Sequence, residues 1–322
     1  MSSNPLLLRY LVKRISLFPV IIFSVITINF ILIHAAPGGP FQILLSDPTF
    51  TKQELLNLEA QYGLNKPLYQ QYLTYIYQVF SGNFGISYFY GIPVITVILD
   101  YLPNTLLLAG ISLLVSSLVG IVLGILSAMR GKLLDKTINV AAIASYTTPV
   151  FWQGLMMILI FSVYLKILPS TGIYLSTSGF DPFQFLRHII MPVISLSLLL
   201  FPPIYFFTRS SVLEVNKKDF IKALRAKGLR ERVIFLKHSF RNALLPVVTL
   251  IGLQSTILFG GATIVEIVFT WPGIGLLTYT AILNKDYPVL LGTLFFYALL
   301  VASLNLIVDL VYVKIDPRIV YR

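Results

Sequence analysis

Long apolar stretches without Asp, Glu, Lys or Arg take up most of the chain. Six of them are at least 21 residues long and cover residues 15–46, 101–129, 137–165, 188–208, 242–265 and 287–308. A helix of about 20 apolar residues crosses the hydrocarbon core of a bilayer, whereas a membrane barrel shows short segments of alternating hydrophobicity. The pattern therefore predicts an all-α integral membrane protein with six transmembrane helices.

The spacing of these helices divides the chain into three parts. Residues 1–36 hold the N-terminus and the first membrane helix, 37–100 form the longest polar segment, and 101–322 hold the other five helices. Pro149 lies inside the third predicted helix, and Pro246 is expected to start the fifth. Proline kinks a membrane helix, which suits a transporter, although proline is also common in membrane helices generally.

The polar segment 37–100 has a helical pattern of its own. We expect one helix to start at Thr51 and to stop at Tyr62–Gly63, and an aromatic helix to follow over 67–80. Tyrosine rings are favoured where a helix lies along a membrane interface. An ordinary packed cap outside the membrane explains the same residues equally well.

A seventh apolar segment, 267–283, is too short and too interrupted for a regular membrane helix. It carries Trp271, Pro272, Gly273 and Gly275 in its first half. We interpret it as a re-entrant or interfacial helix, which is tolerated at membrane depth where protein covers its backbone.

The composition and the placement of charge give the topology. The chain is 57% hydrophobic and only 11% charged, with a mean hydropathy of +0.84 and a net charge of +11, whereas soluble domains are about a quarter charged. With six helices and a cytoplasmic N-terminus, 19 of the 24 basic residues fall on the cytoplasmic side, as the positive-inside rule requires. We therefore expect a multi-pass protein of the cell membrane with both termini cytoplasmic, and no nucleic-acid partner.

Motifs for chemistry are missing from the sequence. It has no cysteine and no Gly-rich phosphate-binding loop ending in Gly-Lys-Ser/Thr, and its three histidines, His34, His188 and His238, are too dispersed for a metal site. The only charged residues expected inside the bilayer are Glu266, near the outer end of the fifth predicted helix, and Asp309, near the inner end of the sixth, and both lie close to an interface. We therefore expect no catalytic or metal residue, and a source of energy on another chain.

A basic loop over 209–243 separates the fourth and fifth predicted helices. Between Lys217 and Arg241 it holds nine basic residues against Asp219 and Glu231. Asp219 is expected to start a short helix with Phe220, Leu224 and Lys227 along one face, and Gly228 is expected to end it, since glycine tolerates a positive φ.

A second helix should follow in the basic loop. The residues Val233, Leu236, Phe240 and Leu244 predict an apolar stripe along it. The two helices suit either a basic hairpin resting on anionic lipid or an element that docks into a partner. Periodicity alone leaves both alternatives open.

The same loop resembles the cytoplasmic coupling loop, or EAA loop, of ABC importer permeases, in which Ala-x-x-x-x-Gly precedes Leu-Pro. Here Lys222-Ala223-Leu224 stands where the motif name has Glu-Ala-Ala. Arg225 through Leu229 and His238 through Val248 are similar to the dipeptide/oligopeptide branch, "ARAKGL…RHALRNALLPVV". Leu224 departs from the usual alanine of that branch.

The resemblance covers nearly the whole chain. Matching stretches occur in the right order, with Gly39 replacing a common acidic residue in the second of them: 10–14, 37–40, 102–106, 148–172, 266–277, 282–293 and 305–318. The long segment after the first helix is similar to the B-type subunit of the two paired permeases. The alternative from another class is a self-contained channel or secondary transporter.

The resemblance implies a subunit that forms half of a translocation pathway for peptides, with oligosaccharides or nickel as alternatives. It implies as partners a second homologous permease, two cytoplasmic ABC ATPases that bind ATP and Mg²⁺, an external substrate-binding protein and membrane lipid, with no cofactor on this chain. The residues implied in ATPase coupling are Asp219, Lys222, Ala223, Leu224, Arg225, Ala226, Lys227, Gly228 and Leu229, with Leu245 and Pro246 at the loop end. Candidates for the pathway or gate are Thr249, Gln254, Ser255, Glu266 and Trp271.

Overall fold

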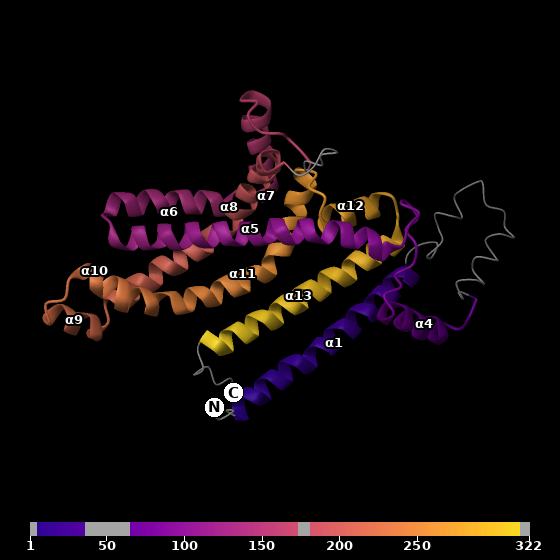
Figure 1. Ribbon diagram of the computed structural model, residues 1–322, viewed down its shortest axis with the longest axis horizontal. Helices are drawn as coiled ribbons and strands as arrows, with labels where there is room; N and C mark the ends of the chain where they lie inside the picture. Colours follow the sequence, from indigo (N-terminus) through magenta and orange to yellow (C-terminus); the bar gives the residue numbers. More distant parts are fainter. Residues whose placement is uncertain (1–4, 36–64, 173–180, 316–322) are drawn as a thin grey trace. The chain divides into compact units, whose positions relative to one another are not determined.

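The computed structural model describes residues 5–35, 65–172 and 181–315. Helices make up most of this part of the chain (Figure 1). In chain order they are α1 (Pro5–Ala35), α4 (Leu68–Phe80), α5 (Val94–Met129), α6 (Lys132–Thr147), α7 (Val150–Met157), the π-helix η1 (Ile158–Tyr164), α8 (Pro182–Asn216), α9 (Asp219–Ala226), α10 (Glu231–Val233), the π-helix η2 (Ile234–Ser239), α11 (Phe240–Val268), α12 (Ile274–Leu283) and α13 (Tyr287–Ile315).

Four of these helices, α1, α5, α8 and α13, are long and apolar enough to cross a membrane as single helices. Two further spans are formed by pairs of helices that meet at a bend. Counting each bent pair as one span gives up to six, in agreement with the six predicted apolar runs.

The third predicted span is bent at Pro149, as expected of a proline inside it, and the bend is sharp enough to divide the span into two helical segments. The α6 segment and the α7–η1 segment meet at 103°. Pro149 is the N-cap of α7, and Thr148 before it is extended, with φ −82° and ψ 127°. The proline ring disfavours the helical region for the residue that precedes it, which accounts for the end of α6 at Thr147.

The fifth span differs from the prediction in the position of Pro246. Pro246 does not start a helix but lies inside α11, which begins at Phe240. The axis bends by 42° between Leu244 and Pro246. The missing N–H of a proline inside a helix and the clash of its ring with the preceding turn account for such a bend.

The contacts of the chain divide it into two compact units. Unit 1 is Met1–Leu7, Asn104–Gly275 and Leu304–Arg322, and unit 2 is Leu8–Pro103 and Leu276–Ser303. Each of them is built around its own buried residues.

Unit 1 is organised around α8, which packs against α6, α7 and α11. Its largest buried cluster joins residues of α5, α7, α8 and α11 with Phe269 and Trp271. Small residues let α5 approach α8 closely: a Cβ added to Gly120 would lie 2.8 Å from the Cβ of Ile204, and one added to Gly124 2.7 Å from the Cβ of Thr208. Glycine four residues apart is a common way to pack membrane helices.

Unit 2 contains the aromatic helix that the sequence predicts, observed as α4. Its Tyr72 hydroxyl lies 2.6 Å from the Thr27 hydroxyl of α1, and Gln71 hydrogen-bonds His34 at 3.0 Å. Tyr69 and Tyr77 of the same helix are exposed, so α4 both packs on α1 and offers rings to its surroundings. The helix start predicted at Thr51 and the stop at Tyr62–Gly63 lie outside the described residues.

The start of α13 in unit 2 is fixed by one buried carboxylate. Asp286 precedes the helix and accepts a hydrogen bond from the backbone N–H of Val289 at 3.3 Å. Its other oxygen accepts from the Ser87 hydroxyl at 2.5 Å and from the Phe89 N–H at 3.1 Å. Asp286 therefore caps α13 and holds the turn before α5.

Candidate functional site

The basic loop of unit 1 folds into two short helical arms after α8: the first is α9, and the second is formed by α10, η2 and the first turn of α11. The helix α9 begins at Asp219, as the sequence predicts, after the two-residue link Lys217–Lys218. Asp219 lies in the first turn, where the partial positive charge of the helix N-terminus favours a carboxylate, and it pairs with Lys222 at 2.8 Å.

Gly228 ends α9, which confirms the predicted stop, and the geometry explains why glycine is needed. Its φ is +77°, and its N–H donates to the carbonyl of Arg225 at 2.9 Å. The N–H of Leu229 reaches back to the carbonyl of Leu224 at 3.4 Å. These two bonds form a Schellman motif, in which a left-handed residue closes the helix. A Cβ at Gly228 would meet nothing within 4 Å, so the constraint is the backbone angle alone.

An ion pair joins the two arms of the loop. Arg225 of α9 donates from Nε and Nη2 to the two carboxylate oxygens of Glu231 at 2.6 and 3.2 Å. Hydrogen bonding to Glu231 raises the pKa of Arg225. Because both side chains are exposed, the pair fixes the shape of the loop more than it adds to its stability.

The buried face of the second arm differs from the predicted stripe. Val233 and Leu236 are exposed, whereas Ile234 and Ala243 are almost fully buried. The reason is the π-helix η2, which has more residues per turn than an α-helix and therefore shifts the buried side of the arm. In α9 the buried residue is Ile221, whereas Phe220, which the sequence places on one face with Leu224 and Lys227, is exposed.

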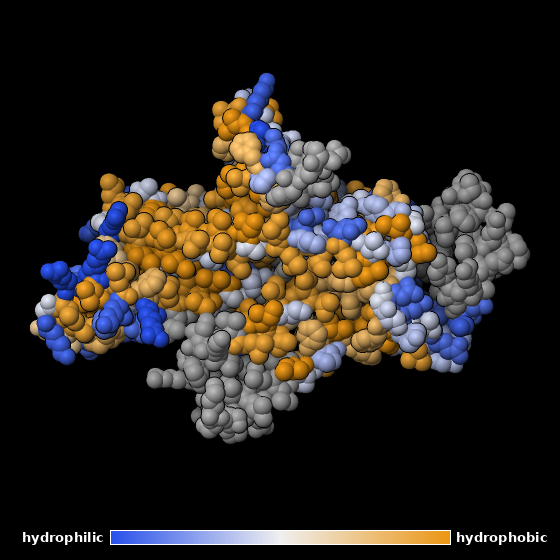
Figure 2. Space-filling model, in the orientation of Figure 1, coloured by the Kyte–Doolittle hydropathy of each residue, from blue (hydrophilic) through white to orange (hydrophobic). Residues whose placement is uncertain are grey.

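The outward surface of α9 and of its C-terminal turn carries mainly small and basic residues. Figure 2 shows hydrophilic side chains gathered over this end of unit 1. The predicted residues that are exposed here are Asp219, Lys222, Ala223, Arg225, Ala226, Lys227, Gly228 and Leu229, while Leu224 is half-buried. Within the described part of the chain, no ion pair forms at Lys217, Lys227, Arg230, Arg232, Lys237 or Arg241.

Two polar contacts fasten the second arm to α8. The Ser211 hydroxyl donates to the carbonyl of Ala243 at 2.8 Å, and the Ser239 hydroxyl donates to the side chain of Asn216 at 2.7 Å. Val212, Val215 and Ala243 form a buried cluster between them. The base of the loop is therefore packed, and α9 stands on it as the exposed part.

A second group of predicted residues, Glu266 and Trp271, lies where α11 passes into α12. Both side chains are completely buried. The carboxylate of Glu266 accepts from the Thr105 hydroxyl at 2.8 Å and from the Gly275 N–H at 2.7 Å. The Trp271 ring N–H donates to the carbonyl of Asn104 at 3.0 Å. We call these residues, with Gly273 and Ile274, the Glu266 cluster.

The glycines of the Glu266 cluster make room for the carboxylate. A Cβ on Gly273 would collide with the Glu266 carboxylate, and one on Gly275 would lie 2.6 Å from the Cα of Thr263. The carboxylate also lies at the first turn of α12, which is a favourable place for a negative charge. The cluster therefore joins the α5 residues Asn104 and Thr105 to the α11–α12 turn.

Sequence comparison with known proteins decides the family. The family described as "Binding-protein-dependent transport system inner membrane component" matches residues 120–321, and its N-terminal counterpart matches residues 7–109. The chain belongs to this family of membrane permeases.

Characterised relatives resemble the permease over nearly its whole length. The oligopeptide transport system permease protein AppB of Bacillus subtilis is 36% identical, covering 97% of this chain and 99% of the relative. The dipeptide transport system permease protein DppB of Escherichia coli K12 is 34% identical, covering 98% and 100%.

Solved structures share the fold of the permease. An inward-facing form of the MetNI methionine ABC transporter has a TM-score of 0.57 at 18% identity, covering 68% of this chain and 96% of that chain. An amino acid ABC transporter crystallised with histidines has a TM-score of 0.53 at 11% identity, covering 68% and 94%. The part of this permease that these comparisons cover thus has the fold of known ABC transporter chains.

The remaining predicted residues of the permease lie on α11. Gln254 and Ser255 are nearly buried within the chain, and the Ser255 hydroxyl donates to the carbonyl of Gly252 at 2.6 Å. Thr249 is half-buried, and Pro246 is exposed at the bend. For Leu245 only the backbone is described. The role of these residues in a pathway stays a prediction.

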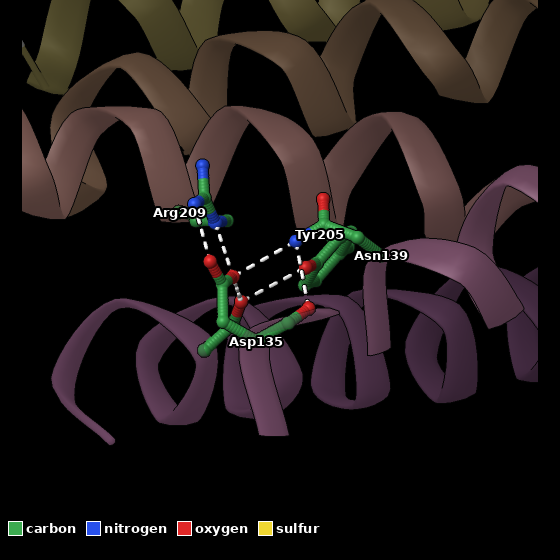
Figure 3. A network of polar contacts seen from close by, with 5 residues as sticks. Asp135, Asn139, Tyr205 and Arg209 are labelled. Carbon is green, nitrogen blue, oxygen red and sulfur yellow. Dashed lines mark hydrogen bonds and ion pairs between the residues drawn. The ribbon is translucent and has the colours of Figure 1, made fainter. Parts of the chain in front are cut away.

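One polar network was missed by sequence reasoning. Asp135 of α6 and Arg209 of α8 form a two-point ion pair, with Ser127, Asn139 and Tyr205 around it (Figure 3). We call these five residues the Asp135 network. Arg209 was counted only as one of the basic residues of the loop. The signal in the sequence is that Asp135 is a lone acid among the basic residues of the short turn between two apolar runs.

Proposed function

We propose that the chain is one of two permease subunits of an ATP-driven importer of peptides. The observation that carries this proposal is the similarity to relatives named as oligopeptide and dipeptide permeases, at 34–36% identity over nearly full length. In this assembly a second homologous permease completes the pathway, two ATPase subunits bind ATP and Mg²⁺, and an external binding protein delivers the peptide.

In this proposal the α9 segment, Asp219–Leu229, docks into an ATPase subunit. Its exposed alanines and Gly228 allow close packing, and Lys222, Arg225 and Lys227 supply charge for an acidic partner or for lipid headgroups. The basic loop then faces the cytoplasm, and so do both termini. ATP binding moves the ATPases, and the docked helix carries that movement into the membrane helices. For this to drive transport, ATP must bind more tightly in one of the two access states of the importer than in the other, because a ligand shifts an equilibrium only by its different affinity for the two states.

The second part of the proposal assigns the translocation pathway and its gate to the Glu266 cluster and to the polar residues of α11. Thr249, Gln254 and Ser255 contribute to the pathway, and Glu266 and Trp271 shape the end of the gate opposite the basic loop. Polar residues in membrane helices also hold helices together, and the burial of Glu266 and Trp271 supports a gate that is closed by packing within the chain.

The proposal is tested by reconstitution into lipid vesicles. The complete assembly, with partner permease, ATPases and binding protein, is loaded with ATP on the ATPase side. It should accumulate peptides from an equimolar mixture of tri- to hexapeptides, measured by mass spectrometry of the vesicle contents. The permease alone, reconstituted in the same vesicles, is the control and should give no flux.

Two results would contradict the proposal. Flux through the permease alone would indicate a self-contained channel or secondary transporter. Accumulation of an oligosaccharide mixture or of Ni²⁺ instead of the peptides, by the complete assembly, would keep the importer and change its substrate.

A further inference from the structure

The Asp135 network connects three helices of unit 1 through a single carboxylate. Arg209 of α8 donates from Nε to Oδ1 of Asp135 at 2.6 Å and from Nη2 to Oδ2 at 2.7 Å. The Ser127 hydroxyl of α5 donates to the same Oδ1, and the Asn139 amide donates to it at 2.8 Å from the next turn of α6. The Tyr205 hydroxyl of α8 lies 2.9 Å from the Ser127 hydroxyl.

The position of the network along α8 relates it to the basic loop. From Arg209 the helix continues without a break to Asn216, and α9 begins three residues later at Asp219. Seven residues of helix span about 10 Å. On this same stretch, Ser211 and Asn216 hold the second arm of the loop. The end of α8 therefore leads directly into α9, is hydrogen-bonded to the second arm of the loop and is ion-paired with α6.

The ion pair between Asp135 and Arg209 constrains the helices more strictly than the apolar packing around it does. Ile138 and Ala142 of α6 already pack on Phe201 and Tyr205 of α8, but apolar contact is non-directional and permits helices to slide past one another. A two-point contact between guanidinium and carboxylate fixes both distance and orientation. The side chains of Arg209 and Asp135 are 29% and 25% exposed, so the pair is partly shielded from water.

We propose that Asp135 and Arg209 are positioning residues that transmit movement of α9 to the α5–α6 hairpin. This inference rests on the proposed docking of α9 to an ATPase. When α9 is moved, the end of α8 moves with it, and the ion pair makes α5 and α6 follow as one body. Without the pair α8 moves alone, so ATP is hydrolysed but the pathway does not change its access.

The experiment compares four variants in the complete vesicle-reconstituted assembly, with the tri- to hexapeptide mixture as the probe. Asp135→Asn and Arg209→Gln each leave one charge without its partner, and the double variant removes both charges. Arg209→Lys keeps the charge but loses the two-point geometry. The readouts are the amount of assembled complex and the number of peptides accumulated per ATP hydrolysed.

The double variant separates coupling from stability. Each single variant leaves an uncompensated charge and should lower the amount of complex, whereas removing both charges should restore the amount. We expect the ratio of peptide to ATP to stay about tenfold below that of the unaltered permease in the double variant, and Arg209→Lys to fall between the two.

Two outcomes overturn the inference. One is an unchanged ratio in the double variant. The other is a loss of uptake and ATP hydrolysis in proportion to the amount of complex, including the case in which no variant assembles, because that indicates a purely structural role. Gly228→Val, measured in parallel, tells which proposal fails: if it lowers the ratio and the double variant does not, only the role of the Asp135 network is wrong. If neither lowers the ratio, the docking of α9 is wrong as well.

Discussion

The exposed α9 segment and the Glu266 cluster both combine polar groups with glycine, yet they use them in opposite ways. In α9 the charges face outward, and Gly228 is needed for a positive φ with open space around it. In the Glu266 cluster the carboxylate is fully buried, and Gly273 and Gly275 are needed because other atoms of the chain occupy the space of a side chain.

This difference predicts which property of the permease should suffer when each region is altered. The hydrogen bonds of the Glu266 cluster are made within the chain, so its loss should be felt as instability of the permease itself. The polar surface of α9 contributes little to the folded chain, because exposed charges gain little from one another. Its loss should be felt in the assembled importer.

The largest effect is expected at Glu266. Glu266→Ala removes the acceptor of the Thr105 hydroxyl and of the Gly275 N–H, and each buried donor left unpaired costs about 1–3 kcal/mol of unfolding free energy. The midpoint of thermal unfolding of the purified permease in detergent should fall clearly. Glu266→Gln keeps one acceptor oxygen and is the matched control with an intermediate loss. An unchanged midpoint in Glu266→Ala would remove the distinction between the two regions.

The next effect is expected at Gly228, where the backbone angle alone is at stake. Gly228→Val places a β-branched residue at φ +77°, at a cost of about 1–2 kcal/mol for the left-handed conformation. The end of α9 should be displaced, and peptide accumulated per ATP hydrolysed should fall while the permease still assembles.

Gly228→Asn is the control for this prediction, because asparagine tolerates the left-handed region better than other residues. It should retain most of the coupling. Equal losses in the valine and asparagine variants would mean that size at this surface matters, and not the backbone angle.

A smaller effect is expected at Trp271. Trp271→Phe keeps a buried ring but loses the hydrogen bond to the carbonyl of Asn104, which is worth about 1 kcal/mol. The thermal midpoint should fall less than in Glu266→Ala. A drop as large as that of Glu266→Ala would show that the indole ring, and not the carboxylate, holds the cluster together.

The smallest effect on stability is expected at Arg225. Arg225→Gln breaks the exposed pair with Glu231, and salt already weakens such pairs, so the thermal midpoint should not change measurably. Peptide accumulation per ATP hydrolysed should still fall, since the two arms of the loop are no longer joined. A clear fall of the midpoint would place Arg225 among the residues that stabilise the chain.

Much of the fold could be predicted because its causes are local. A continuous apolar run of about 20 residues is long enough to cross a membrane whatever lies next to it, and the Asp219 start and the Gly228 stop of α9 follow from turn chemistry within a few residues. The predictions that were wrong concern which side of a helix is buried and where a helix begins. The buried face of the second arm shifted at η2, and Pro246 lies inside α11 and not at the start of the fifth span.

The sequence by itself determined the class of the protein, the approximate membrane helices and the exposed turn of α9, because apolar length and a positive φ need no distant partner. Only the tertiary structure decided which polar residues meet. Thr105 and Glu266 are 161 positions apart, and Asp135 and Arg209 are 74 apart. Their pairing follows from the packing of α5, α6, α8 and α11, and in a low-dielectric interior a polar group must find such a partner wherever the fold brings one.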